Sequence, residues 1–222
     1  RLIVKSVLIL GASGGIGKAI ASKFESMGHK VIKPTSADVD LRNPPDLQEN
    51  KKVQILINCA GINPIKPFED IIEKDFNDVL KINFMGFLDI IKQVSPYMRE
   101  AGSGYILNIS SLYGSFSRKN RLMYATSKHA ANGMVKTLAL ELARDNIKVN
   151  SLSPGFVMTK MTTKNNSREK IKSWEQKIPL GKLATPQDIA NVAYFLCSEQ
   201  NSYITGQNIV VDGGYSVGGF EG

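Results

Sequence analysis

The sequence is poor in the residues that build disulfide-bonded, metal-binding and membrane-spanning proteins. It has two cysteines, Cys59 and Cys197, too few for a disulfide framework, and this favours a reducing, cytoplasmic location. Its two histidines, His29 and His129, lack the spacing of metal ligands, so we expect no metal site. No apolar run reaches the roughly 18 residues of a membrane-spanning helix. The segment before the first glycines contains Lys5, which indicates a strand rather than a signal peptide.

Acidic residues are also fewer than basic ones, 20 against 28, which gives the 222 residues a net charge of +8. Residues 160–182 contain seven basic and two acidic side chains and so carry +5 of that charge. A second basic cluster is Arg118, Lys119 and Arg121. These clusters favour an anionic partner, such as a nucleic acid, an acidic protein or an acidic small molecule, with a solvated helix face as the alternative.

Apolar runs alternate with helical patterns along the chain, as in βαβ units that form a parallel sheet. One of these stretches is uniformly apolar at Ile55-Leu-Ile57, which is typical of strands covered by helices on both faces. We expect strands at 5–10, 30–32, 53–58, 105–109, 147–151 and 209–211, and helices at 16–27, 69–82, 85–99, 124–144 and 186–197. No linker rich in proline or glycine divides this series, so we predict one α/β domain over residues 1–222.

Two motifs follow predicted strands and are rich in small residues. The first, Gly11-Ala-Ser-Gly-Gly-Ile-Gly17, precedes a predicted helix, and such glycines let the backbone approach a pyrophosphate at the N-terminus of that helix. The second, Asn58-Cys-Ala-Gly61, leaves room for a flat ring at the carboxyl end of a strand. Each motif alone could also be a purely structural turn.

A third motif has the residues of a proton-transfer site. Tyr124 and Lys128 are four residues apart on a predicted helix and so share one face. An ammonium beside a phenol lowers the phenol pKa toward neutrality, where it can donate and accept a proton. Ser111 follows another apolar strand, and its hydroxyl could hold a carbonyl oxygen beside the tyrosine. An exposed Tyr/Lys pair without a role is the alternative.

Together these motifs resemble the short-chain dehydrogenase/reductase family, in order and from end to end. Residues 11–17 resemble its cofactor loop, and residues 58–61 resemble its NNAG turn with Cys59 in place of the second asparagine. The other matches are Asn83, the serine motif 108–114 with Ser111, the YxxxK pair Tyr124 and Lys128, the segment 150–155 with Thr159, and Val211-Asp-Gly-Gly214. The resemblance implies a single Rossmann-type doubly wound parallel sheet with helices on both faces.

The resemblance also implies hydride transfer between a nicotinamide and a carbonyl or secondary alcohol. Tyr124 would be the general acid/base, Lys128 would lower its pKa and bind the nicotinamide ribose, and Ser111 would orient the substrate oxygen. Asn83 would hold a water that links Lys128 to solvent. The implied cofactor-binding residues are Gly11, Ser13, Gly14, Gly15, Ile16, Gly17, Ser36, Asp40, Leu41, Asn58, Ala60, Gly61, Tyr124, Lys128, Pro154, Gly155, Val157 and Thr159.

The sequence departs from the family after its second predicted strand. There the family has a full helix and a third strand, whereas residues 30–36 run almost directly into residues 38–41. We therefore expect no crossover helix and at most a very short third strand, with Asp40 and Leu41 at the adenine ring. Leu10 stands where the family has a threonine that braces the cofactor loop.

The shortened segment bears on the choice of cofactor. A preference for NAD needs an acid at the end of the second strand, and residues 33–36 contain none, with Asp38 slightly later. The residues that could instead receive the 2′-phosphate of NADP are Lys33, Thr35, Ser36 and Ser13. We favour NADP(H) over NAD(H), unless the short loop moves Asp38 inward.

The basic segment falls where the family has its substrate lid, at about 156–182. We expect an anionic substrate, either a 3-oxoacyl carrier thioester, as in 3-oxoacyl-[acyl-carrier-protein] reductase-like members, or a sugar acid or nucleotide-sugar. Trp174 would pack the lid or touch this substrate. The resemblance also implies a homodimer or homotetramer through the helices at 69–99 and 124–144.

Three other functions fit parts of the sequence. An NAD-dependent alcohol or polyol dehydrogenase would have the same catalytic residues. A nicotinamide-sensing regulatory protein would not need Ser111, Tyr124 and Lys128, so their presence favours an enzyme. A specific nucleic-acid binder is disfavoured because the basic residues are not interleaved with stacking aromatics.

Overall fold

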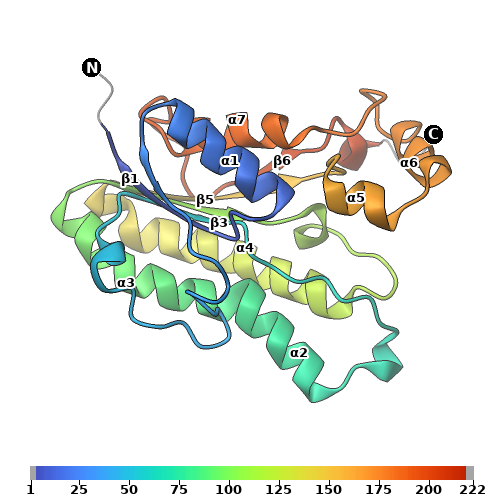
Figure 1. The fold of residues 1–222 in the computed structure, drawn as a ribbon, viewed down its shortest axis with the longest axis horizontal. Coiled ribbons are helices and arrows are strands. Elements are labelled where there is room, and N and C mark those ends of the chain that lie inside the picture. The colour runs from blue at the N-terminus through green and yellow to red at the C-terminus, as the bar shows by residue number, and fades with distance from the viewer. Residues whose placement is uncertain (1–3, 219–222) are drawn as a thin grey trace.

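A computed structural model describes residues 4–218, and Figure 1 shows a sheet between two layers of helices. Its strands are β1 (Ser6–Leu10), β2 (Lys30–Ile32), β3 (Ile55–Asn58), β4 (Gly104–Ile109), β5 (Ile147–Pro154) and β6 (Asn208–Val211). Its helices are α1 (Gly15–Ser26), α2 (Glu73–Leu80), α3 (Gly86–Glu100), α4 (Leu122–Leu142), α5 (Lys160–Asn165), α6 (Arg168–Glu175) and α7 (Pro186–Leu196). The predicted single α/β domain is confirmed.

The strands form one sheet in the order β2-β1-β3-β4-β5-β6, and every neighbouring pair is parallel. α1 and α7 cover one face, and α3 and α4 cover the other (Figure 1). Two hydrophobic cores result, one around Phe24 and Ile57 and the other around Phe87 and Leu56. Alternate residues of β3 enter opposite cores, which explains why its sequence is apolar throughout.

The shortened segment after β2 contains neither the crossover helix nor a third strand. β2 is therefore an edge strand of the sheet, and residues 33–47 cross its carboxyl end without regular secondary structure. Val39, Leu41 and Leu47 are buried in the core beneath α3 and anchor this segment. A Cβ on Gly86 would lie 2.1 Å from the carbonyl oxygen of Leu41, so a glycine at the start of α3 lets the segment pack closely.

The structure corrects two predicted helices. The helix expected at 69–82 begins at Glu73, after a short 3-10 turn at Phe68–Asp70. The expected break before α3 is absent, because a π-helical segment at Lys81–Met85 joins α2 to α3. Such segments widen a helix locally and are frequent at functional sites. α5 and α6 lie in the basic stretch, for which a helix was only the alternative interpretation, and begin at the side-chain caps Thr159 and Ser167.

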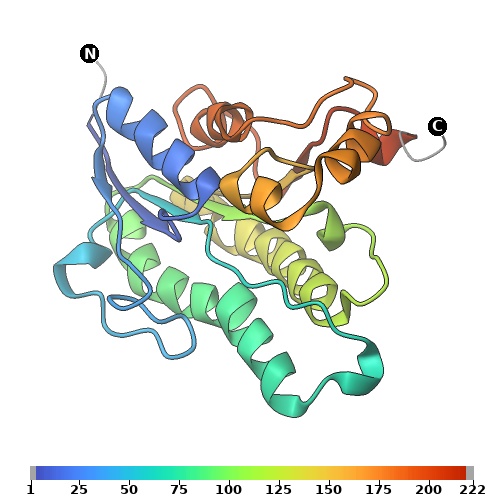
Figure 2. The same cartoon turned by 45° about the vertical axis from the view of Figure 1, so that its right-hand side comes forward.

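Four of the candidate functional segments follow the carboxyl ends of strands. Because the strands are parallel, these ends meet at one edge of the sheet. Gly11 follows β1, Cys59 follows β3, Ser111 comes shortly after β4 and Gly155 follows β5. Figure 2 shows α5 and α6, in orange, at the same end of the molecule. None of the helices in residues 4–218 is long and apolar enough to cross a membrane.

Candidate active site

The glycine-rich loop packs against two other segments of the site. Gly11 has a φ of 73°, and a Cβ there would lie 2.6 Å from the backbone nitrogen of Ala60. A Cβ on Gly15 would lie 2.9 Å from Cγ2 of Thr159. A Cβ on Gly17 would lie 2.3 Å from the carbonyl oxygen of Gly11. These contacts explain why the loop needs glycine at each position.

The N-terminus of α1 is suited to an anion. Its N-cap, Gly14, offers no side chain to the first N–H groups of the helix, and no acidic residue stands in the first turn. These N–H groups and the positive end of the helix dipole can therefore bind a phosphate. Ile16, in the same turn, packs against the core beneath α1 and holds the helix start in place.

A cavity of about 320 Å³ lies beside this loop, and we call it the first cavity. Leu41, Ala60 and Gly61 form part of its wall, and the place of Leu41 at an adenine ring stays a prediction. Its polar lining consists of Ser13, Thr35, Ser36, Asp40 and Arg42. The shortened segment after β2 thus forms one side of the cavity although it has no regular structure.

The charged residues of that segment are not placed as the sequence suggested. Asp38 does not line the first cavity, because its carboxylate accepts hydrogen bonds from the backbone and side chain of Thr35, both at 2.8 Å. Lys33 pairs with Glu25 of α1 and does not line the cavity either. The alternative in which Asp38 moves inward to favour NAD is therefore not supported.

Arg42 is a site residue that the sequence analysis missed. It lines the first cavity, and its Nε donates to both carboxylate oxygens of Asp40, at 3.0 and 3.2 Å. This guanidinium lowers the pKa of Asp40. Apolar and charged residues alternate over residues 39–42, and this alternation was the signal in the sequence. Val39 and Leu41 are buried, whereas Asp40 and Arg42 face outward.

Cys59 also lines the first cavity, in the place of the family's second asparagine. Burial raises the pKa of its thiol to about 12, so the group is neutral at physiological pH.

Within residues 4–218, no group of three or more His, Cys, Asp or Glu side chains could hold a metal ion.

Tyr124 and Lys128 share one face of α4 as predicted. The Nζ of Lys128 lies 5.5 Å from the centre of the Tyr124 ring and donates a 2.9 Å hydrogen bond to the carbonyl oxygen of Ile109. Ser111 caps a 3-10 turn at Leu112–Gly114 and accepts a hydrogen bond from the backbone of Tyr113 at 3.2 Å. Its side chain is near enough to the phenol of Tyr124 to act on the pKa of that group. The structure therefore brings these three side chains together.

The pKa values at this site are governed by burial. Burial lowers the pKa of Lys128 to about 8. Burial raises the pKa of Tyr124, and the neighbouring Ser111 side chain and the charge of Arg121 only oppose that rise. This direction is opposite to the one expected from Lys128 alone. The physical reason is that the phenol is enclosed, while the nearby ammonium points to a backbone carbonyl.

Asn83 lies in the π-helical segment and faces the same site. Its Oδ1 accepts a 2.8 Å hydrogen bond from the backbone N–H of Ile62, and its Nδ2 donates to the carbonyl oxygen of Ile62 and to Ser127. A Cβ on Gly61 would lie 3.3 Å from this Oδ1 and 3.6 Å from the Nζ of Lys128. Asn83 therefore adjoins Lys128, and its role in holding a water stays a prediction.

Asn58 braces the strand ends rather than facing a cavity. It is fully buried, and its side chain donates to Asn108 and accepts from the backbone of Ala60, both at 3.1 Å. Val157 is also buried, and Thr159 caps α5. These predicted cofactor residues lie in the walls that support the site.

A second cavity, of about 390 Å³, extends from Ser111 to α6 and includes Pro154 and Gly155. Phe156 and Trp174 stack in its wall with ring centres 4.7 Å apart, and Tyr215 meets Phe156 edge-on at 5.1 Å. Trp174 therefore both packs against its neighbour and lines the cavity.

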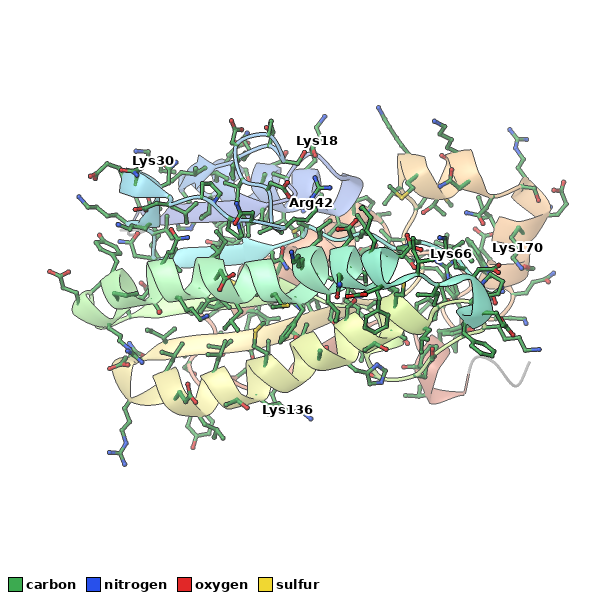
Figure 3. All side chains as sticks on the ribbon, turned by 90° about the horizontal axis from the view of Figure 1, so that it is seen from below. Lys18, Lys30, Arg42, Lys66, Lys136 and Lys170 are labelled. Atoms are coloured by element: carbon green, nitrogen blue, oxygen red, sulfur yellow. The ribbon has the colours of Figure 1, made fainter. Side chains whose placement is uncertain are left out.

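Basic side chains surround this second cavity. Arg118, Lys170 and Lys177 line it, and a wider cleft of about 1220 Å³ continues past Lys119 and Arg121. No described acidic residue lines either space, and none of these five cations forms an ion pair within residues 4–218. Figure 3 shows Lys170 at this end of the molecule, with Lys136 pointing away from the outer side of α4.

Comparison with known proteins identifies the family. A family model described as Enoyl-(Acyl carrier protein) reductase matches residues 47–216. The 3-oxoacyl-[acyl-carrier-protein] reductase FabG of Thermotoga maritima is 35% identical, over 96% of this chain and 98% of that protein. The chain belongs to the short-chain dehydrogenase/reductase family. This makes it an NAD(P)-dependent oxidoreductase.

Two solved structures share the fold of this chain. The ligand-free aldohexose dehydrogenase of Thermoplasma acidophilum is 30% identical, with a TM-score of 0.88 over 96% of this chain and 94% of that one. ElxO with NADP bound is 27% identical, with a TM-score of 0.86 over 97% of this chain and 100% of that one. The uncapped start of α1 and the crowded glycines beside it fit the pyrophosphate of such a dinucleotide.

Proposed function

We propose that this chain is an NADPH-dependent ketoreductase of anionic substrates, with 3-oxoacyl thioesters of an acidic carrier as the first candidates. The observation that carries the proposal is the second cavity. Its wall includes Ser111, together with Arg118, Lys170 and Lys177, and its described lining contains no acidic residue. The 35% identical relative supports the acyl class.

NADPH, when bound, would supply the hydride that adds to the carbonyl carbon. Ser111 orients the carbonyl oxygen, and the phenol of Tyr124 gives its proton to that oxygen, so the product is a secondary alcohol. Burial keeps the pKa of Tyr124 high, and the phenol is therefore protonated at neutral pH, as reduction requires. The ammonium of Lys128 stabilises the phenolate that remains until solvent returns the proton.

The preference for NADPH would come from the lining of the first cavity. Ser13 and Ser36 offer hydroxyls, and Arg42 is the cation among the described lining residues. Only Nε of Arg42 is used by Asp40, so its terminal nitrogens remain to bind a phosphate. The residues therefore fit a 2′-phosphate better than the two ribose hydroxyls of NAD.

Arg42→Ala should raise the KM for NADPH by about 10- to 100-fold and leave the KM for NADH nearly unchanged. A charged hydrogen bond contributes about 1.5–3 kcal/mol, and only NADPH would lose it. Lys33→Ala is the matched control, because Lys33 is in the same segment but pairs with Glu25 outside the cavity. Steady-state kinetics with both cofactors measures the effect. Equal losses for NADPH and NADH would contradict this assignment.

The double variant Lys170→Ala/Lys177→Ala should lower kcat/KM for an anionic 3-oxoacyl thioester by about 10-fold or more and weaken its dependence on salt. The two ammonium groups line the cavity and attract the anion, and salt screens such attraction. Lys136→Ala on the outer side of α4 is the control. A neutral ketone should be reduced equally well by all variants. If both substrates lose activity equally, or neither does, the anionic class is wrong.

A second substrate class has support from one comparison. The aldohexose dehydrogenase of Thermoplasma acidophilum, at 30% identity, favours a sugar or sugar acid as the alternative substrate.

Three further expectations stay predictions: the lid at about 156–182, the homodimer or homotetramer, and the cytoplasmic location.

A further inference from the structure

Asn132 extends the row of site residues on α4. Tyr124, Lys128 and Asn132 follow one another at intervals of four residues and so lie on one face of the helix. Only 8% of the Asn132 surface is exposed. Its Nδ2 donates a 3.1 Å hydrogen bond to the carbonyl oxygen of Gly114, the last residue of the 3-10 turn that Ser111 caps. α4 thus contacts the serine loop beyond its catalytic pair.

Two hydrogen bonds from α4 hold the two ends of this loop. Lys128 donates to the carbonyl oxygen of Ile109 at 2.9 Å, where β4 ends. Asn132 donates to Gly114 at the other end, and Ser111 lies between. Tyr124 is on the same helix as both donors, so these bonds join the helix that carries the phenol to both ends of the loop that carries Ser111.

Stability alone does not explain an asparagine at position 132. A Cβ on Gly114 would lie 2.5 Å from Nδ2 of Asn132 and 2.9 Å from Oγ of Ser110. The Asn132 amide can therefore contact the loop only because residue 114 is a glycine. Oδ1 of Asn132 and Oγ of Ser110 are buried, and neither has a hydrogen-bond partner within residues 4–218. Burying unpartnered polar atoms costs free energy that an apolar side chain would avoid.

We propose that Asn132 is a positioning residue that clamps the serine loop to α4 and fixes the Ser111 hydroxyl against Tyr124. Its effect on turnover rests on the proposed reductase function, but its effect on the position of Ser111 beside Tyr124 does not. Misplacing a group that orients the substrate by a fraction of an ångström is enough to slow the chemical step.

Asn132→Leu, which removes the donor at similar volume, should lower kcat about 10-fold and leave the KM for NADPH unchanged. The carbon-13 chemical shift of Tyr124 Cζ, the carbon that bears the hydroxyl, should change toward the value measured in Ser111→Ala. The resonance is assigned by its absence from the spectrum of Tyr124→Phe. This second readout needs no turnover. If Asn132→Leu does not fold, Asn132→Ala removes the same donor without adding bulk and is measured in the same two ways.

Asn201→Leu is the matched control, because Asn201 is 1% exposed and donates to the carbonyl oxygens of Leu196 and Ile204 away from the site. It should lose stability but keep kcat and the Tyr124 resonance. An Asn132 variant whose Tyr124 resonance stays at the wild-type position, or shifts no more than in Asn201→Leu, overturns the proposal. Wild-type protein without reductase activity overturns the proposed function instead, and the resonance still decides the role of Asn132.

Discussion

Tyr124→Phe should lose about 10³-fold or more in kcat while its affinity for NADPH stays within a few-fold of wild type. General acid catalysis by a positioned side chain contributes about 10²–10⁴-fold, and the phenol is the proton donor in the proposed reaction. Removing one oxygen atom leaves the ring in place beside Lys128, so the site should keep its shape. Initial rates of NADPH oxidation and a fluorescence titration with NADPH measure the two quantities.

Tyr194→Phe is the control for this experiment. Tyr194 is buried on α7 against Phe24, on the opposite face of the sheet from α4. Its variant should turn over at the wild-type rate. If Tyr124→Phe keeps a substantial fraction of wild-type activity, the phenol is not the proton donor and the mechanism is wrong.

Lys128→Met should lose about 10²-fold or more in turnover and yet melt at a higher temperature than wild type at pH 7. The ammonium is 3% exposed, and burial lowers its pKa to about 8 from the usual 10.5. Such a shift corresponds to about 3 kcal/mol of destabilisation at neutral pH, at about 1.4 kcal/mol per pKa unit. The lost hydrogen bond to Ile109 offsets about 1 kcal/mol, so a net gain of about 2 kcal/mol is expected.

The difference in melting temperature should depend on pH in one direction. Below pH 8, Lys128 is protonated in both the folded and the unfolded chain, and the full cost of burying its charge remains. Between about 8 and 10.5, the folded chain has released the proton and the unfolded chain still binds it, so this group makes wild type more stable as the pH rises. Melting scans from pH 6 to 10 should therefore show the advantage of Lys128→Met shrinking. A variant that is less stable at pH 7, or an advantage independent of pH, contradicts this account.

The sequence predicted those parts of the site that depend on local geometry. Tyr124 and Lys128 share a helix face because of their spacing, and the glycines of the cofactor loop are explained by the turn from β1 into α1. The parallel sheet follows from strands that are apolar throughout, such as β3. The absence of the crossover helix was predictable because too few residues separate β2 from residues 38–41 to form one.

The parts that the sequence could not predict depend on tertiary contacts. Arg42 lines the first cavity because Val39 and Leu41 are anchored in a core made by distant residues. The pKa of Tyr124 rises rather than falls because burial, which no local pattern reveals, outweighs its polar neighbours. The prediction of a break before α3 was wrong because a π-helical segment accommodates Asn83 and the helix continues through it.

The most direct test of the proposed function is kcat/KM of the purified wild-type protein for an anionic 3-oxoacyl thioester, measured with NADPH and with NADH. We expect one NADPH to be oxidised for each 3-hydroxyacyl product formed. We also expect kcat/KM with NADPH to exceed kcat/KM with NADH by about 10-fold or more. A 10-fold difference corresponds to about 1.4 kcal/mol from the contacts to the 2′-phosphate. No oxidation of either cofactor with this substrate, or a clear preference for NADH, would contradict the account.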